Sequence, residues 1–143
     1  TNFHDANLTY VDLSGKDITG TILTSADLTG ANLDGVDLSG KDLTRTNLTS
    51  ADLSGKDLTG TILKGANLTV TTLNKVDLSG KDLTETILRG ASLSNANLTG
   101  VILKKADLTN ANLTGTNLTG ADLTDANLTG TILNCIGHPV CIQ

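Results

Sequence analysis

Leucine returns at every fifth position through almost the whole chain. Counting from Phe3 in steps of five as far as Leu133 gives 27 positions, of which 25 are leucine and the other two are Phe3 and Ile18. A period of five fits neither the 3.6-residue turn of an α-helix nor the two-residue repeat of a strand. A helix would spread these leucines around its circumference, and a strand would send alternate leucines to opposite faces. The spacing therefore predicts a chain that turns once per five residues and points every leucine inward.

The residues around each central leucine are restricted as well. The position two before it is small, with eleven Ala, eight Thr and four Val, and the position directly before it is Asp or Asn in twenty repeats. The position after it is Thr or Ser in twenty repeats, and the next is Gly in fourteen. Glycine tolerates the positive φ of a tight corner, and short polar side chains bond to backbone groups at turns. We expect the small residue to lie inside with the leucine and the polar residues to face solvent.

With the motif A-(D/N)-L-(T/S)-G repeated through residues 1–133, the chain resembles the pentapeptide-repeat family, especially its uninterrupted cyanobacterial and chloroplast-lumen members. The resemblance implies an all-β fold, a right-handed quadrilateral β-helix (a β-solenoid) of about seven coils with four repeats each. A longer period agrees with coils of this size, because residues 21–60 align with residues 61–100 and a shift of 40 equals two such coils. We expect a β-helix over 1–133 and a C-terminal cap or tail over 134–143.

The composition excludes several classes of partner. The net charge is -5 and the ten basic residues are scattered, whereas a surface that binds nucleic acid directly needs clustered Lys and Arg. No apolar run approaches the roughly 20 residues of a membrane span. Phe3 and Tyr10 are the only aromatic residues, so the core must be aliphatic.

Four lysines occupy the small inward position: Lys16, Lys41, Lys56 and Lys81. An ammonium group without a partner costs several kcal/mol in a leucine core, so we expect these side chains to leave through the corner with their stems on apolar surface. On a four-sided coil they lie beside one row of outward aspartates, which consists of Asp17, Asp37, Asp57 and Asp77. Two interpretations stay open: the lysines balance the charge of this row, or the group forms a patch for a partner.

Isoleucine replaces the outward Asp or Asn in alternate coils of one side, at Ile22, Ile62 and Ile102. An exposed apolar row is typical of a contact surface, although β-branched residues also simply favour strands. Together with the four lysines and the four aspartates, these isoleucines form the candidate interaction surface.

The repeat stops after Leu133, and the tail NCIGHPVCIQ holds both cysteines of the chain. Their short spacing at the end of a solenoid favours a disulfide between Cys135 and Cys141 that fixes a cap. Two free thiols, or a metal held by Cys135, His138 and Cys141 without a clear fourth ligand, are the alternatives. A disulfide indicates an oxidising compartment such as the thylakoid lumen or the periplasm, and free thiols would fit the cytoplasm.

Nothing in the sequence predicts catalysis, a metal or another cofactor. The two histidines, His4 and His138, stand at opposite ends of the chain, and the glycines recur at corners rather than in a phosphate loop. Solvated carboxylates lack the burial that tunes a catalytic pKa, and a leucine-filled interior leaves no pocket. We expect a protein that is not an enzyme.

The sequence favours a non-catalytic structural or protein-interaction module that binds an unknown protein partner. The family resemblance adds an alternative, a DNA mimic that binds DNA gyrase and gives quinolone resistance, but this chain lacks the frequent Phe centres, the loop insertions and the apolar C-terminal helix of those members. A remote alternative is an ice-binding surface formed by a row of threonines: Thr9, Thr29, Thr49, Thr69, Thr109 and Thr129. The chain contains no Met and its first coil is open, which is compatible with a removed leader or with end-to-end association, so we expect either a monomer or an end-to-end dimer.

Overall fold

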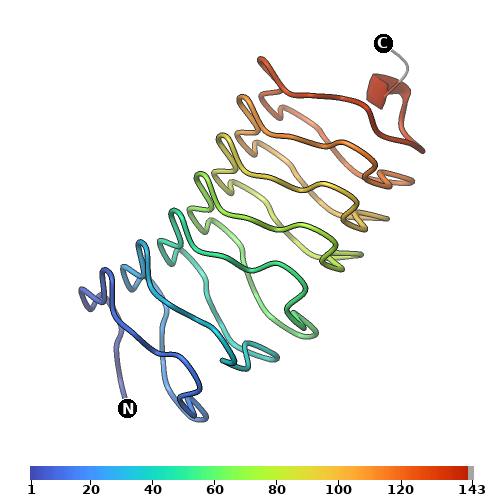
Figure 1. The fold of residues 1–143 in the computed structure, drawn as a ribbon. Coiled ribbons are helices and arrows are strands. Elements are labelled where there is room, and N and C mark those ends of the chain that lie inside the picture. Colours follow the sequence, from blue (N-terminus) through green and yellow to red (C-terminus); the bar gives the residue numbers. More distant parts are fainter. Residues whose placement is uncertain (142–143) are drawn as a thin grey trace.

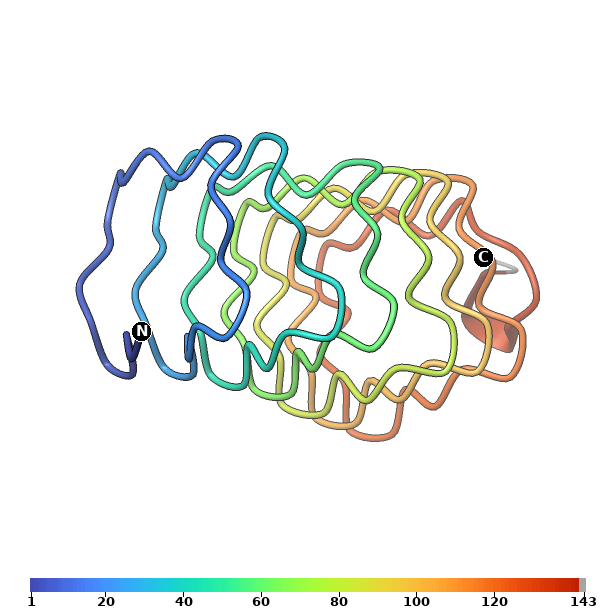
Figure 2. The same cartoon turned by 90° about the horizontal axis from the view of Figure 1, so that it is seen from below.

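A computed structural model describes residues 1–141 of the 143-residue chain. The backbone winds as a β-helix whose coils follow one another along a single axis, with residue 1 at one end and the C-terminal tail at the other (Figures 1 and 2). Parallel bridges join residues that are 20 apart in the sequence, such as Asn7 with Asp27 and Asn97 with Asn117. Each coil therefore takes four five-residue repeats, and the predicted β-helix is confirmed.

The bridging residue of each repeat is the one before the central leucine, so these residues form four rows along the axis. We name each row after its first member and follow it in steps of 20: the Asn2 row, the Asn7 row, the Asp12 row and the Asp17 row. A repeat that pairs does so at this single position rather than along a longer strand, because the chain turns again after it.

The only helix in residues 1–141 is one short 3-10 turn, η1, at Pro139–Cys141. Within the same residues, no helix is both long enough and apolar enough to pass through a bilayer.

A corner residue with positive φ lies two positions after each central residue from Phe3 to Leu128. Fourteen glycines and twelve other residues adopt this conformation, with φ between 55° and 71°. Each turn is closed by the amide that follows the corner, as where Ala26 N–H donates to the Leu23 carbonyl at 3.0 Å. The corner explains the frequent glycine, because other residues pay a steric cost there. Val70, with φ 55°, is the least suited of the twelve because its side chain is β-branched.

The interior is packed as the repeat predicts. Central leucines such as Leu28 and Leu108 are fully buried, and so are small residues such as Ala66 and Ala111. Phe3 at the first coil and Leu133 at the last are only partly buried and pack against this core. Stacked leucines and small residues therefore hold the coils together, and cover is incomplete at both ends.

The tail lies on the last coils. Ile136 bridges Asn117 at a spacing of 19 residues instead of 20, and Val140 packs against the core. Cys135 and Cys141 form the predicted disulfide, with their Cα atoms 5.1 Å apart. A Cβ on Gly137 would lie 2.8 Å from the Thr119 nitrogen, so this close approach needs glycine. Positions 142 and 143 of the predicted cap fall outside the described residues.

A candidate interaction surface

The pairing between coils is interrupted in one part of the β-helix. Six expected bridges between residues 20 apart are missing within residues 1–141: 17 with 37, 22 with 42, 32 with 52, 37 with 57, 57 with 77, and 62 with 82. Five of them belong to the Asp17 and Asn2 rows, whereas the Asn7 row is paired throughout. Beyond residue 82 every described coil is paired, and the yellow-to-red coils in Figure 1 stack more evenly than the blue-to-green ones.

Three of the six interruptions lie on the N-terminal side of an inward-position lysine, those of 17 with 37 and 57 with 77 lie on the C-terminal side of Lys16 and Lys56, and that of 32 with 52 has no lysine beside it. Lys41, Lys56 and Lys81 each have a coil on their N-terminal side, and in all three cases the bridge to that coil is missing. The amino groups turn back toward it. Lys41 donates to the Ile18 carbonyl, Lys56 to the Leu33 carbonyl at 2.6 Å, and Lys81 to the Thr61 carbonyl at 3.0 Å. A lysine at this position therefore replaces backbone pairing with a side-chain bond to the preceding coil.

Threonine at the same position makes the same kind of bond without the interruption. The Thr46 hydroxyl donates to the Leu23 carbonyl at 2.9 Å while the bridge between Asp27 and Asn47 is intact. Thr61 and the Leu38 carbonyl repeat this arrangement at 2.8 Å, again beside an intact bridge. The bond to the carbonyl is therefore compatible with pairing where threonine makes it, whereas pairing is missing at the three lysines that make it.

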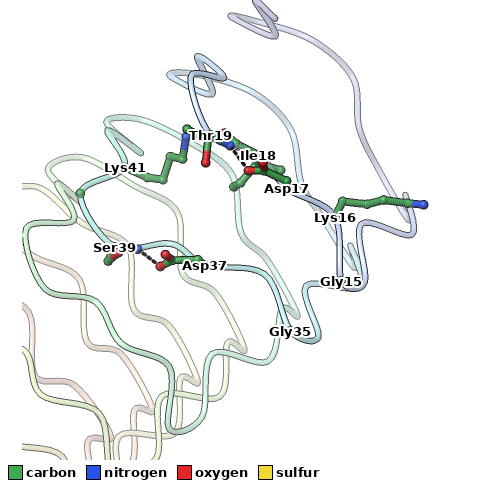
Figure 3. A pocket seen from close by; sticks show the side chains of 10 residues that line it. Gly15, Lys16, Asp17, Ile18, Thr19, Gly35, Asp37, Ser39 and Lys41 are labelled. Carbon is green, nitrogen blue, oxygen red and sulfur yellow. Dashed lines mark hydrogen bonds between the residues drawn. The ribbon is translucent and has the colours of Figure 1, made fainter.

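The lysines only partly follow the predicted path. Lys16 is exposed and points away from the coil (Figure 3), as expected of a side chain that leaves through the corner. The other three are half-buried and bonded to carbonyls instead. Among residues 1–141 none of the four forms an ion pair; the cations that do, besides His4, are Lys64 with Asp82 at 3.4 Å, Arg89 with Asp107 at 3.8 Å and Lys104 with Asp122 at 3.2 Å.

The aspartates of the Asp17 row bond mainly to their own repeats. Asp17 accepts the Thr19 amide at 2.8 Å and Asp37 accepts the Ser39 amide at 2.8 Å. These hydrogen bonds hold the pKa of both carboxyls below the usual value, and the nearby charge of Lys41 lowers each pKa less. Asp57 opposes this by raising the pKa of Asp37. The row is therefore ionised near neutral pH, and charge balance by the lysines is a secondary effect.

Lys81 shows the cost of its half-buried position. Burial lowers the pKa of its ammonium group, and the charges of Asp77 and Asp57 raise it again to a smaller extent. Its bond to the Thr61 carbonyl compensates part of the lost hydration.

Two surface grooves lie where the Asp17 row is unpaired. The first, about 390 Å³, runs between residues 15–19 of one coil and 35–41 of the next (Figure 3). The second, about 270 Å³, runs between residues 56–60 and 77–81. The two sets of residues are related by the 40-residue repeat of the sequence. A leucine-filled interior was expected to leave no pocket, and these hollows differ because they open on the outside, between coils.

The three isoleucines are not equivalent. Ile22 and Ile62 are 49% and 48% exposed, and each lies at an interrupted bridge. Ile102 is half-buried and paired on both sides, with Asp82 and with Asp122. The structure thus brings Ile22 and Ile62 together with the lysines and aspartates, while Ile102 lies in the regular part of its row.

The remaining candidates are engaged in local contacts. The hydroxyls of the threonine row each donate to the Asn or Asp of their own repeat where this residue is present, as for Thr29 with Asp27 at 2.6 Å and Thr49 with Asn47 at 2.6 Å. His138 accepts the Val140 amide at 3.2 Å. No three His, Cys, Asp or Glu side chains in residues 1–141 gather as metal ligands would.

Comparisons with known proteins identify the repeat. The family model described as pentapeptide repeats matches in eight copies over residues 1–40, 42–80, 66–104, 82–115 and 103–134. The crystal structure of HetL, a pentapeptide repeat protein involved in heterocyst differentiation regulation from Nostoc sp. strain PCC 7120, is 32% identical. That alignment covers 96% of this chain and 78% of HetL, with a TM-score of 0.38.

Two further solved structures are similar to this chain. A pentapeptide repeat protein from the thylakoid lumen of Arabidopsis thaliana is 35% identical over 82% of this chain and 68% of its own, with a TM-score of 0.28. The plasmid-mediated fluoroquinolone resistance protein QnrB1 is 21% identical over 92% of this chain and 79% of its own, with a TM-score of 0.40.

At its level of identity, the likeness to QnrB1 carries nothing about function. No curated protein matches the chain. The family model covers nearly all of residues 1–134, and the inward leucines and positive-φ corners match its repeat. The chain therefore belongs to the pentapeptide-repeat family, whose fold is the right-handed β-helix.

Proposed function

We propose that this chain is a non-catalytic protein-interaction module that contacts its partner through one side of the β-helix. We call this the lysine side: the Asp17 and Asn2 rows between residues 16 and 82, with the lysines before them. It contains the candidate residues Lys16, Asp17, Ile22, Asp37, Lys41, Lys56, Asp57, Ile62, Asp77 and Lys81. Ile102 belongs to the same row but lies outside this segment.

One observation carries the proposal: the inward lysines and five of the six missing bridges gather on these two neighbouring rows. A typical hydrogen bond contributes about 0.5–1.5 kcal/mol to stability, so lysine at these positions lowers the stability of the β-helix. A feature that costs stability and is confined to one side is typical of a functional surface.

Charge balance alone explains this arrangement poorly. Lys104 reaches Asp122 from the position after the central leucine, and the bridge between Ile102 and Asp122 is intact there, whereas Lys64 reaches Asp82 across the missing bridge between Ile62 and Asp82. A lysine that only neutralised the aspartate row could stand there as well. The inward position is needed only if the opened backbone itself matters.

A site-specific crosslinking experiment tests the proposal. A photoreactive side chain at Ser39, in the first groove, should crosslink to a partner in extract from the native cells. The same probe at Thr49, which follows the fully paired Asn7 row, should not. Equal crosslinking at both positions, or crosslinking at Thr49 alone, would reject the lysine side as the contact surface.

Finer features of the fold belong to the same proposal. We take the cross-section to be quadrilateral, with about seven coils, and the tail from residue 134 to act as a cap on the last coil. The 20-residue spacing of the bridges and the packing of Val140 and Cys141 on the core support these assignments. A monomer or an end-to-end dimer is compatible with a side-on contact, and sedimentation velocity distinguishes the two.

We further propose an oxidising compartment, such as the thylakoid lumen or the periplasm. The disulfide between Cys135 and Cys141 supports it, as does the likeness to a lumenal protein of Arabidopsis thaliana. Intact-mass measurement of the protein, trapped with an alkylating agent as it is released from cells, tests this. Failure of both cysteines to react supports the assignment, and alkylation of both would place the protein in a reducing compartment such as the cytoplasm.

A further inference from the structure

The two grooves are two copies of one site. In each, three backbone N–H groups and three backbone carbonyls have no hydrogen-bond partner in residues 1–141. In the first groove these are the N–H groups of Ile18, Gly20 and Asp37 and the carbonyls of Lys16, Asp37 and Ser39. In the second they are the N–H groups of Leu58, Gly60 and Asp77 and the carbonyls of Lys56, Asp77 and Ser79. Each member of the first set matches a member of the second 40 residues later.

The same positions farther along the Asp17 row show what these groups do when paired. Leu98 N–H donates to the Asn117 carbonyl at 2.9 Å, and Gly100 N–H donates to the Thr119 carbonyl at 2.8 Å. Asn117 N–H returns a bond to the Ala96 carbonyl at 3.2 Å. The unpaired groups of the grooves are therefore the donors and acceptors that form a parallel ladder farther along this row.

The gap between the two grooves is closed by a side chain. Lys56 places its amino group 2.6 Å from the Leu33 carbonyl and 3.5 Å from the Val36 carbonyl, on the side that faces this gap. Gly40 N–H also still donates to the Thr59 carbonyl at 2.8 Å. The two grooves are thus separated by an unpaired gap that the Lys56 side chain and one backbone hydrogen bond span.

Two aspartates and two lysines line each groove. Asp17 and Asp37 stand on the two walls of the first groove, and Asp57 and Asp77 take the same places in the second. All four are exposed, and hydrogen bonds from their own repeats lower their pKa, so they carry full charge. The amino groups of Lys41, Lys56 and Lys81 are turned onto carbonyls, and Lys16 points away from the coil (Figure 3). Apart from Lys16, the carboxylates are therefore the charged groups that are not bonded to a backbone carbonyl at the entrance.

We propose that each groove binds an extended segment of a partner protein that carries lysine or arginine on its outward face. An extended backbone presents N–H and carbonyl groups in the alternating order that the groove walls leave unsatisfied. Basic side chains complement the aspartates at the rim, and the same carboxylates repel nucleic-acid phosphates. The proposal rests on the proposed function, because it gives the chemistry of the partner that the lysine side contacts.

The repetition of the site adds a consequence for affinity. Two coils separate the grooves, a distance on the order of 10 Å for coils spaced as paired strands are. A partner with two basic segments joined by a short loop can occupy both, and the second binding step is then intramolecular. We therefore expect a single segment to bind weakly and a linked pair to bind more tightly.

Binding of a defined peptide tests the inference. The probe is an acetylated and amidated peptide of alternating valine and lysine, about seven residues long, added to the full chain labelled with ¹⁵N. We expect amide signals of the six unpaired N–H groups to shift, while Leu98, Gly100 and Asn117 stay unchanged. The control peptides carry glutamate in place of lysine, or N-methylated backbone, and should bind at least about tenfold more weakly. No shift at these six amides, or equal binding of either control, overturns the proposal.

Variants of the chain separate the groove from the charge around it. Replacing all four inward-position lysines with threonine keeps the aspartates and should abolish peptide binding, because threonine at this position is compatible with pairing. The variant Lys64→Thr with Lys104→Thr removes positive charge elsewhere and should bind as the unchanged chain does. If the variant with four threonines bound the peptide as tightly as the unchanged chain does, the proposal would be contradicted.

The two proposals can fail separately. If a partner crosslinks at Ser39 but the peptide does not bind, the proposal of an extended basic segment in the groove is contradicted. The proposal that the lysine side is the contact surface then remains. The opposite outcome is also possible: the peptide binds at the groove amides, but the native partner crosslinks only at Thr49. This outcome would contradict the proposed function and would leave the groove as a peptide-binding site that the native partner does not use.

Discussion

Residues 16–82 and residues 83–134 are built from the same repeat, and their cores are alike. Leu58 in the first segment is 2% exposed and Leu98, 40 residues later in the same row, is 1% exposed. The amide of Leu98 is bonded to the next coil, whereas that of Leu58 has no partner within the described residues. We call the first the lysine segment and the second the regular segment.

The difference shows that the leucine core and the backbone ladder are separable. Six bridges are missing in the lysine segment, yet its central residues from Ile18 to Leu78 remain buried. Burial of the leucines therefore holds the coils in place. Apolar burial contributes about 25 cal/mol per Å² and, unlike a backbone hydrogen bond, does not depend on the orientation of the groups. A lysine two before the leucine accompanies three of the six missing bridges, so this position influences whether the ladder closes around that core.

The largest effect should come from a charge placed in the shared core. Leu58→Asp puts an ionised carboxylate where no partner exists, which costs several kcal/mol. We expect loss of the folded β-helix, measured as loss of the cooperative thermal transition in circular dichroism. Leu98→Asp should do the same in the regular segment. A folded Leu58→Asp variant would show that leucines of the lysine segment are not structural.

Restoring the missing bridges of the lysine segment should stabilise the β-helix. Replacing Lys16, Lys41, Lys56 and Lys81 together with threonine keeps a donor for the carbonyls and allows the missing bridges to form. We expect a gain of about 1–3 kcal/mol in the free energy of unfolding, because several hydrogen bonds are restored at a modest net value each. Denaturant unfolding followed by circular dichroism measures it. The control Lys64→Thr with Lys104→Thr should lose stability slightly or not at all, and a destabilised quadruple variant would contradict the role assigned to these four lysines.

A smaller gain is expected at one corner of the lysine segment. Val70→Gly relieves a β-branched residue held at φ 55° and should stabilise the chain by about 1 kcal/mol. Gly100→Ala, at a corner of the regular segment where a Cβ would meet nothing within 4 Å, should destabilise it by a similar amount. Thermal unfolding of the two variants gives the comparison. An unchanged midpoint in both would mean that corner conformation carries little of the stability.

Acid should weaken the lysine segment before the regular one. Seven aspartates with lowered pKa lie in residues 16–82 and two in residues 83–134. Hydrogen bonds to the ionised form lower these pKa values, so their contribution is complete above about pH 4 and is lost as the pH falls below it. We expect amide exchange to accelerate first in residues 16–82 when the protein is titrated from pH 5 to pH 2. Simultaneous acceleration in both segments would oppose this.

The smallest effect should follow Asp57→Asn. Asparagine keeps the oxygen that accepts the Thr59 amide, as Asn97 does for Thr99 in the regular segment. The thermal midpoint at pH 7 should stay unchanged within error. A loss as large as that of Leu58→Asp would mean that inward and outward positions are wrongly assigned.

The regular part of the fold could be predicted because the same five-residue pattern occurs 27 times in one register. The inward leucines, the corner at Gly15 and the disulfide between Cys135 and Cys141 all follow from position in the repeat, and the structure contains them. The four lysines could be singled out as exceptions for the same reason.

What those exceptions do could not be predicted from the repeat. The path of Lys41 depends on the distance to a carbonyl 23 residues earlier, which exists only once the coils are stacked. The grooves depend on which of two neighbouring gaps the Lys56 side chain closes. The threonine at position 46 was the available signal, because it shows that the inward position faces a carbonyl of the preceding coil.

Amide hydrogen exchange at matched positions tests the central claim most directly. The N–H groups of Leu58, Gly60 and Asp77 have no partner in the described residues, and those of Leu98, Gly100 and Asn117 are bonded to the neighbouring coil. We expect the first three to exchange at least about a hundredfold faster than the second three under native conditions. In the quadruple threonine variant, the first three should become as slow as the second. Equal protection of both sets in the unchanged protein would contradict the account, because the ladder would then be closed along its whole length.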